Sequence, residues 1–379
     1  KDTITGRYWY ASIKKYFTFD FIFHKKPMEI KRIPHFKEPI ATKLFGEIPN
    51  GKPVFNHQLV NENGMELHIM DYGATITAVK IPSNDGTLID VVLGFDSLEQ
   101  YIKSFDLPAP PYFGATVGRY AGRINNGSFS LNGKTVQLHQ NNNDHALHGG
   151  NRGFSQVVWE KEPATDSENN SITFSYVSQD KEECFPGSLK VTLTYTLTDN
   201  NEIILDYKAI SDQDTIVNLT HHSYFNLDGQ QADVKNQDLF VNANLMLETN
   251  YDNIPTGWFV NLKDHKYDFN PYRKCPLFID NTFVLPENTS LAASLSSSTT
   301  DIKMEVFTDQ PAVHIYIGGN CFNTIRGKER ANYHAMSGIC FETQNFPDAP
   351  NHAHFPNAVL KKGEMYQQHT IYKFQRISS

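Results

Sequence analysis

The sequence predicts an all-β protein, a large antiparallel β-sandwich with a few short helices. Two observations carry this prediction. From about residue 40 onward, apolar and polar side chains alternate with a period of two, which is typical of strands that bury one face, and helical periodicity is scarce. Because no Gly/Ser-rich or Pro-rich linker interrupts the pattern, we expect one large sandwich rather than two domains.

Two hairpins are predicted where alternating runs flank turn residues. Apolar side chains occupy every second position from Leu189 to Leu197, Asp199-Asn200-Asn201 follows, and alternation resumes from Ile203 to Tyr207. A second hairpin surrounds Asn132-Gly133, because this pair tolerates the positive φ angles of a two-residue turn. Its strands are expected at Phe129–Leu131 and Val136–Leu138.

A further strand and a helix are indicated by the spacing of apolar residues. The strand alternates through Ile172, Phe174 and Tyr176. The helix is the clearest case of apolar residues spaced by three and four, and its positions are Leu98, Tyr101, Ile102 and Phe105.

The N-terminal residues 1–39 differ from the rest of the chain. They are aromatic and basic, lack a clean period, and include Lys31-Arg32-Ile33-Pro34 near their end. We predict an N-terminal extension over residues 1–39 that lies outside the main fold, followed by a single domain over residues 40–379. We expect the extension to matter little for activity.

Composition excludes several classes of partner. The net charge is −8, from 34 Lys and Arg against 42 Asp and Glu, so the basic stripe that nucleic acids require is not expected. The four cysteines are far apart without a CxxC motif, which favours reduced thiols over a zinc cage or a disulfide framework. The apolar stretch Tyr16–Phe23 is too short and too polar for a membrane span or a signal peptide. We expect a cytoplasmic protein without a nucleic-acid or membrane partner.

Histidines gather in three segments that are also rich in turn residues, 145–150, 218–225 and 341–354. A histidine and a carboxylate make an effective proton donor and acceptor near neutral pH. Opening a cyclic hemiacetal needs such a pair, because the anomeric hydroxyl loses a proton while the ring oxygen gains one. His222 and Glu342 fit these two roles.

A metal site is the competing interpretation of the same segments. In principle, a divalent ion could be held by His352, His354, His221, His222 and Asp348. However, His352 and His354 lie in a Pro- and Asn-rich loop where strand alternation is not assured, and no second short-spaced ligand motif accompanies them. We therefore predict neither a metal nor a cofactor. Nucleotide binding is excluded because the glycines near residue 118 form no phosphate loop.

Five separated motifs, in order along the chain, resemble those of the aldose 1-epimerase, or galactose mutarotase, family. The resemblance spans roughly residues 45 to 375. It implies the large β-sandwich of that family and a reaction without a cofactor. The motifs are GATVGRYAGRI (114–124), LHGGNRGF (147–154), NLTHHSYFNLDG (218–229), IDNTFVL (279–285) and FETQNFPDAPNHAHFP (341–356).

The resemblance implies a role for each matching residue. Glu342 corresponds to the general base at the C1 hydroxyl, His222 to the general acid at the ring oxygen, and His148 to a second histidine that hydrogen-bonds the sugar. Arg123 and Asp280 correspond to residues that orient sugar hydroxyls. For Arg123, spacing alone does not distinguish a surface cation from a sugar ligand.

The remaining site positions include departures from the usual family pattern. Tyr224 is expected to line the pocket. Gly122 stands where an asparagine often precedes the arginine, His314 stands where a glutamine commonly contacts substrate, and Asn281 replaces a frequent histidine. These departures leave the acid and the base in place, so they bear on the preferred sugar more than on the reaction.

The predicted function is therefore the interconversion of the α and β anomers of free hexoses such as D-galactose and D-glucose. One alternative is a catalytically silent sugar-binding protein of the same fold, although such a protein needs no matched acid and base. Another is a hexose-phosphate mutarotase, although no additional Arg/Lys cluster accompanies the motifs. The expected partner is a small hexose, and the expected state is a monomer or weak dimer.

Overall fold

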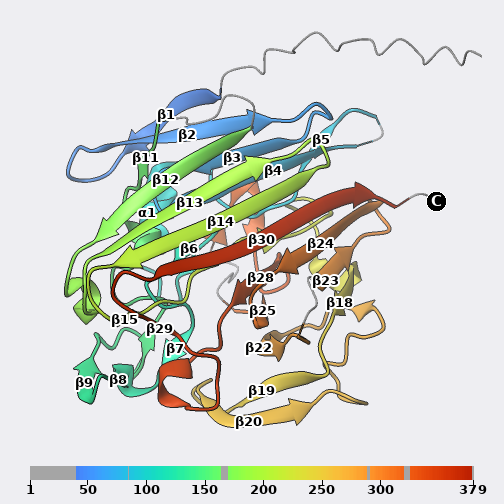
Figure 1. The fold of residues 1–379 in the computed structure, drawn as a ribbon. Helices are drawn as coiled ribbons and strands as arrows, with labels where there is room; N and C mark the ends of the chain where they lie inside the picture. The colour runs from blue at the N-terminus through green and yellow to red at the C-terminus, as the bar shows by residue number, and fades with distance from the viewer. Residues whose placement is uncertain (1–39, 84, 164–169, 288–290, 320–324, 378–379) are drawn as a thin grey trace, which may run out of the picture. The chain divides into compact units, whose positions relative to one another are not determined.

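A computed structural model describes residues 40–83, 85–163, 170–287, 291–319 and 325–377 (Figure 1). The predicted extension 1–39 and Cys321 lie outside the described residues. Antiparallel strands dominate, and the described residues contain one α-helix, α1 (Leu98–Ser104), as predicted. The Ser97 side chain accepts a hydrogen bond from the Gln100 backbone N–H and so caps the helix.

The largest sheet has nine strands, and each pair of neighbours is antiparallel. In Figure 1, β12 to β14 and β30 run side by side within it. In spatial order its strands are β11 (Glu160–Lys161), β12 (Ser171–Ser178), β13 (Leu189–Leu197), β14 (Glu202–Ser211), β30 (Met365–Arg376), β24 (Ile302–Thr308), β23 (Leu291–Ser296), β18 (Asp238–Val241) and β21 (Arg273–Lys274).

Two further antiparallel sheets complete the main architecture. The six-stranded sheet has the order β17 (Tyr224–Phe225), β28 (Ile339–Gln344), β25 (Ala312–Ile317), β22 (Ile279–Val284), β19 (Leu245–Thr249) and β20 (Pro255–Asn261). The five-stranded sheet follows chain order, with β1 (Ala41–Glu47), β2 (Pro53–Val60), β3 (Glu66–Met70), β4 (Thr75–Pro82) and β5 (Leu88–Asp90).

Short elements connect these sheets. The two-stranded pairs are β6 (Thr116–Val117) with β16 (Thr220–His221), β7 (Arg123–Ile124) with β10 (Ala146–Leu147), β8 (Ser128–Leu131) with β9 (Lys134–Gln137), β15 (Thr215–Ile216) with β29 (Val359–Leu360), and β26 (Ile325–Arg326) with β27 (Asn332–Tyr333). The single-turn 3₁₀ helices are Asn125–Gly127, Phe154–Gln156, Glu182–Cys184, Val234–Asn236, Lys328–Arg330 and Ala349–Asn351.

The predicted hairpins are confirmed. β13 and β14 pair with Leu193 opposite Tyr207, and their alternating apolar side chains are buried, because one face of this sheet lies against the core. β8 and β9 meet around Asn132 and Gly133, which both adopt positive φ, as a two-residue turn requires.

The apolar faces of the three large sheets share one hydrophobic core. Leu193 and Tyr372 from the nine-stranded sheet, Ile315 and Phe341 from the six-stranded sheet, and Ile76 from the five-stranded sheet belong to the same buried cluster. This shared core is the physical reason why a continuous period-two pattern folds as one sandwich.

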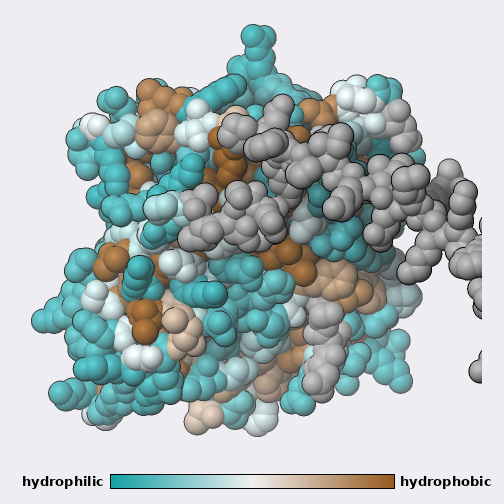
Figure 2. Space-filling view, turned by 45° about the horizontal axis from the view of Figure 1, so that its top comes forward, coloured by the Kyte–Doolittle hydropathy of each residue, from teal (hydrophilic) through white to brown (hydrophobic). Residues whose placement is uncertain are grey.

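One face of the molecule is shown in space-filling form. The face in Figure 2 is mostly hydrophilic, and its apolar side chains form separate groups. None of the helices in the described residues has the length and apolar character needed to cross a membrane.

Arg119 anchors the segment between β6 and β7, which leads into the site. Its side chain is 2% exposed, and its guanidinium donates to the Ser178 hydroxyl and to the carbonyls of Ser178, Gln179, Pro186 and Gly187 at 2.7–3.2 Å. Burial lowers the pKa of Arg119 to about 10, which leaves it charged at neutral pH. The fork of donors ties the segment between β6 and β7 to the connection between β12 and β13.

We expect Arg119→Lys to lower the free energy of unfolding by about 2–4 kcal/mol, because one ammonium cannot reach all these acceptors and leaves buried carbonyls unpaired. Urea unfolding followed by circular dichroism measures the change. The exposed Arg326→Lys serves as control and should change stability by less than about 0.5 kcal/mol. Equal stability of the two variants would contradict the anchoring role.

Candidate active site

A cavity of about 540 Å³ opens beside the six-stranded sheet, within the size range of small-molecule sites. Seven of the eight site residues predicted from the sequence line it. These are Gly122, Arg123, His148, His222, Asp280, His314 and Glu342. Tyr224 does not line the cavity and lies against the imidazole of His222, with ring centroids 5.2 Å apart.

The cavity faces one side of β28. Ile339 and Phe341 belong to the main core, whereas Cys340 belongs to a second buried cluster and Glu342 lines the cavity. Alternation along the strand therefore places the Glu342 carboxylate in the cavity, on the face of β28 opposite to the core side chains Ile339 and Phe341. Glu342 is 3% exposed.

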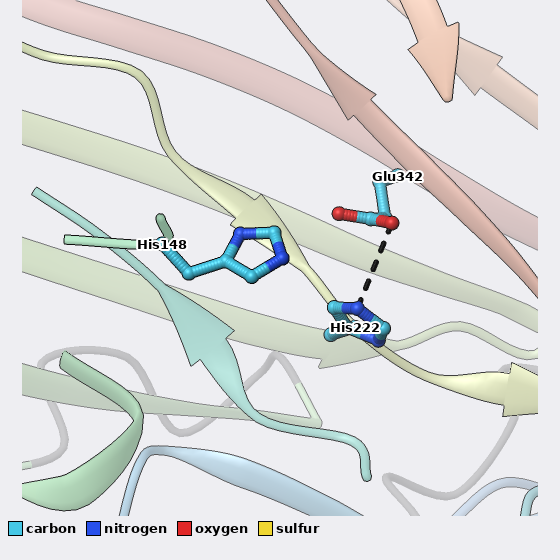
Figure 3. Close-up of side chains that lie close together, drawn as sticks. All are labelled: His148, His222 and Glu342. Atoms are coloured by element: carbon cyan, nitrogen blue, oxygen red, sulfur yellow. Dashed lines mark ion pairs between the residues drawn. The ribbon is translucent and has the colours of Figure 1, made fainter. Parts of the chain in front are cut away.

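His222 lies opposite Glu342, in the turn between β16 and β17. Its backbone N–H donates to the Ala115 carbonyl at 2.9 Å, and its carbonyl accepts from the Gly114 N–H at 3.0 Å. Its Nε2 lies 3.7 Å from Glu342 Oε1, close enough for electrostatic interaction but beyond normal hydrogen-bond length (Figure 3). Its Nδ1 faces Cys340 Sγ at 3.6 Å. Both functional groups are therefore buried and available to a ligand between them.

His148 points toward the same pair (Figure 3). Its Nδ1 accepts a hydrogen bond from the Gly122 N–H at 3.2 Å, so the neutral ring carries its proton on Nε2. Burial lowers the pKa of His148 well below its usual range, and the nearby His222, Arg123 and His314 lower it further. His148 is thus a neutral hydrogen-bond donor at physiological pH.

Gly122 suits the backbone of this segment, which has a positive φ and lies close to Pro347. Its φ is +78°, and a Cβ at this position would lie 3.0 Å from side-chain atoms of Pro347. An asparagine here, which is frequent in the family pattern, would meet both strain and contact. The departure at Gly122 therefore matches the local backbone.

Arg123, on β7, is fixed at one end of its guanidinium. Its Nε donates to Asn142 Oδ1 at 3.0 Å, and its backbone carbonyl accepts from the Asp348 N–H at 2.8 Å. These contacts hold the side chain at the cavity wall, where a planar fork of donors suits sugar hydroxyls.

Asp280 and His314 form a partly buried pair across β22 and β25. His314 Nε2 lies 2.9 Å from Asp280 Oδ1, His314 Nδ1 lies 2.8 Å from the Thr282 hydroxyl, and Asp280 Oδ2 accepts from Asn253 at 3.2 Å. Both ring nitrogens of His314 therefore have protein partners. His314 therefore fixes the position of Asp280 and also lines the cavity.

Each member of this pair stabilises the charged form of the other. Burial acts to raise the pKa of Asp280, but the hydrogen bond and charge of His314 outweigh it, so the pKa lies below its usual value. Burial acts to lower the pKa of His314, but the hydrogen bond to Asp280 and the negative charges of Glu342 and Asp280 outweigh it, so the pKa is raised. The pair therefore favours an ionised Asp280 and a protonated His314.

The histidines considered as alternative metal ligands are dispersed. His352 Nε2 faces Asp348 at 3.2 Å, and His354 Nε2 lies 2.8 Å from the Gly257 carbonyl. His221 is buried against Ser223, and burial lowers its pKa to about 3. These residues do not converge with His222 on one point.

Within the described residues, the potential ligand atoms that do converge are those of His148, His222 and Glu342, which lie within 4.8 Å of one another. The Gly122 N–H nevertheless occupies the lone pair of His148 Nδ1 and leaves the proton on Nε2. A histidine that binds a metal through Nε2 needs the lone pair of Nε2 free, and it carries its proton on Nδ1, from which it donates a hydrogen bond. The chemistry of this trio suits proton transfer better than metal binding.

Sequence analysis missed several residues at the site. Cys340 and Gln344 share the strand face of Glu342, so alternation along β28 is a signal that could have found them. Asn253, which supports Asp280, and Tyr112, which contacts both catalytic-site histidines, lie in loops without a periodic pattern. Tyr112 has a φ of +53°, which no sequence signal indicates.

Comparisons with known proteins agree with this architecture. The model of the family "Aldose 1-epimerase" matches residues 56–373. Galactose mutarotase from Bos taurus is 37% identical over 346 residues, which cover 88% of this chain and 98% of that protein. Aldose 1-epimerase from Escherichia coli K12 is 32% identical over 344 residues, which cover 86% and 96%.

Solved structures show the same fold. Galactose 1-epimerase from Lactobacillus acidophilus superposes with a TM-score of 0.78 at 27% identity, covering 89% of this chain and 99% of that one. An aldose epimerase homologue from C. elegans gives 0.78 at 29% identity, covering 85% and 98%. The predicted mutarotase-like sandwich is confirmed. With a family match across most of its length and relatives matched nearly end to end, this chain belongs to the aldose 1-epimerase family.

Proposed function

We propose that the protein is an aldose 1-epimerase that interconverts the α and β anomers of free hexoses, with D-galactose and D-glucose as substrates. The observation that carries this proposal is the buried pair of His222 Nε2 and Glu342 Oε1, 3.7 Å apart at the wall of a polar cavity. Relatives named galactose mutarotase support galactose as a substrate.

In the proposed reaction, Glu342 takes the proton of the C1 hydroxyl while His222 gives a proton to the ring oxygen. The ring opens to the aldehyde, the C1–C2 bond rotates, and closure reverses both transfers. Because one proton leaves as another arrives, neither an alkoxide nor an oxocarbenium ion has to form. The two residues exchange acid and base roles between opening and closing.

The other lining residues have supporting roles in this proposal. His148 donates from Nε2 to a sugar oxygen, and its neutral state avoids competition with His222 for the acid role. Arg123 and the Asp280–His314 pair orient hydroxyls and restrict the sugar to a productive geometry.

Two observations bear on the alternatives. A binding protein gains nothing from burying an acid opposite a base, which costs desolvation free energy. Among the described lining residues, Arg123 is the only lysine or arginine, so the cavity offers little to a phosphate and favours an uncharged sugar.

We propose a cytoplasmic location and a monomer or weak dimer as the working state. Cys184 and Cys275 are free thiols in the described residues, which is compatible with a reducing compartment.

Purified protein is expected to accelerate the decay of optical rotation of fresh α-D-galactose. Glu342→Gln and His222→Asn should each lower kcat by about 10²–10⁴-fold, because each substitution removes one of the two proton-transfer groups. Circular dichroism checks that the fold is retained. Exposed Glu364→Gln and His139→Asn are matched controls and should keep wild-type rates. Wild-type rotation indistinguishable from buffer would refute the proposed activity.

We propose that residues 40–379 carry the activity. A chain lacking residues 1–39 is expected to retain kcat/KM within about twofold, because all of the site residues named above lie after residue 40. The same polarimetric assay measures it. A large loss in a folded, truncated chain would assign the extension a part in catalysis.

The stability contribution of His314 should depend on pH. Its pKa is raised on folding, so its contribution is fully present below the unfolded value of about 6.5 and is lost as pH rises through the folded value. Asp280 stays ionised in this window because its own pKa is lowered. The stability difference between wild type and His314→Gln, measured by urea unfolding, should therefore shrink from pH 5.5 to pH 8, a range of about 2.5 units. Exposed His354→Gln is the control, and a difference that grows with pH would contradict the assignment.

A further inference from the structure

We propose that Tyr112 is a positioning residue for the acid–base pair: its ring holds His222 and His148 in the cavity and favours the protonated form of His222. This inference rests on the proposed function, because it assigns the acid role to His222. Tyr112 lines the cavity, is 7% exposed, and belongs to no helix or strand.

The ring of Tyr112 contacts both histidines at once. It lies nearly parallel to the His222 imidazole, with centroids 5.8 Å apart and planes inclined by 26°, and it meets the His148 imidazole edge to face at 5.1 Å and 66°. The two imidazoles are themselves 5.5 Å apart at 84°. The three rings therefore fix one another, and removing the tyrosine ring frees both histidines to change rotamer.

The backbone at Tyr112 is strained in order to place this ring. Its φ is +53°, which is rare for a bulky residue, and the conformation is held because the Ala115 N–H donates to the Tyr112 carbonyl at 3.0 Å. A glycine would adopt this conformation without steric cost. The strain is therefore offset by what the side chain contacts, and these contacts are the two histidines and the ring of Phe105, 5.4 Å away.

The stacked geometry has an electrostatic consequence. The face of an aromatic ring carries negative potential and attracts a cation, so a ring stacked on an imidazole stabilises the imidazolium form. Burial raises the pKa of Tyr112 to about 12, so the phenol stays neutral over the range in which the enzyme is assayed.

Other groups also face His222 and set the background for this effect. Glu342 and Cys340 lie on β28, and His221 lies on β16. Tyr224 lies on β17, and its ring stacks on the His222 imidazole with centroids 5.2 Å apart and planes inclined by 29°. His148 and Asp280 interact with His222 electrostatically. Since the carboxylates and Tyr224 remain when Tyr112 is changed, we expect a partial shift rather than loss of the acid.

The test compares Tyr112→Phe with Tyr112→Leu. Tyr112→Phe keeps the ring and should retain kcat and its pH profile. Tyr112→Leu should lower kcat about tenfold with little change in KM, and the alkaline fall of kcat should move to lower pH by about half to one unit. Tyr101→Leu is the matched control, because Tyr101 is equally buried in an aromatic cluster that does not line the cavity, and it should lower stability without moving the profile.

A second measurement keeps this inference separate from the proposed activity. NMR titration of His222 requires no turnover, and its midpoint should move to lower pH in Tyr112→Leu but not in Tyr112→Phe or Tyr101→Leu. An unchanged midpoint and profile in Tyr112→Leu would overturn the inference, as would a Tyr112→Phe variant as impaired as Tyr112→Leu. Inactive wild-type protein would instead refute the proposed function, whatever the titration gives.

Discussion

The rest of the site depends on one constraint, which is that β28 has one face in the core and the other face at the cavity. Ile339 and Phe341 are fixed in the core shared by the large sheets, so Glu342 has to project from the opposite face. Antiparallel pairing then sets its neighbours: β25 brings His314 beside Glu342, and β17 brings Tyr224 beside Cys340. A shift of register by one residue would move the carboxylate into the apolar core.

The orienting charges of the site can be withdrawn from water because each has a partner from another part of the chain. Asp280 is held by His314 and Asn253, and Arg123 is held by Asn142. The exception is the gap between His222 and Glu342, which is too long for a hydrogen bond and leaves both groups ready for a ligand. The fold thus satisfies the orienting residues internally and leaves the reactive pair open.

Loops, rather than strands, complete the other wall of the cavity, and they do so through unusual backbone conformations. His148 and Tyr112 both adopt positive φ, and Gly149 approaches the Gly118 carbonyl so closely that a Cβ would lie 1.9 Å from it. These conformations aim two aromatic side chains at His222. Strain concentrated at the site is compensated by the large core behind it.

The sequence by itself determined the strand-rich fold, two of its hairpins and seven of the residues that line the cavity. Period-two alternation is a local property, and the motifs around His148, His222 and Glu342 carry their own signal. Only the tertiary structure decided that His314 holds Asp280, that Tyr224 lies behind His222, and that Tyr112 stacks on it. These contacts join segments far apart in the chain, and they depend on strand pairing and loop conformation, which no local pattern records.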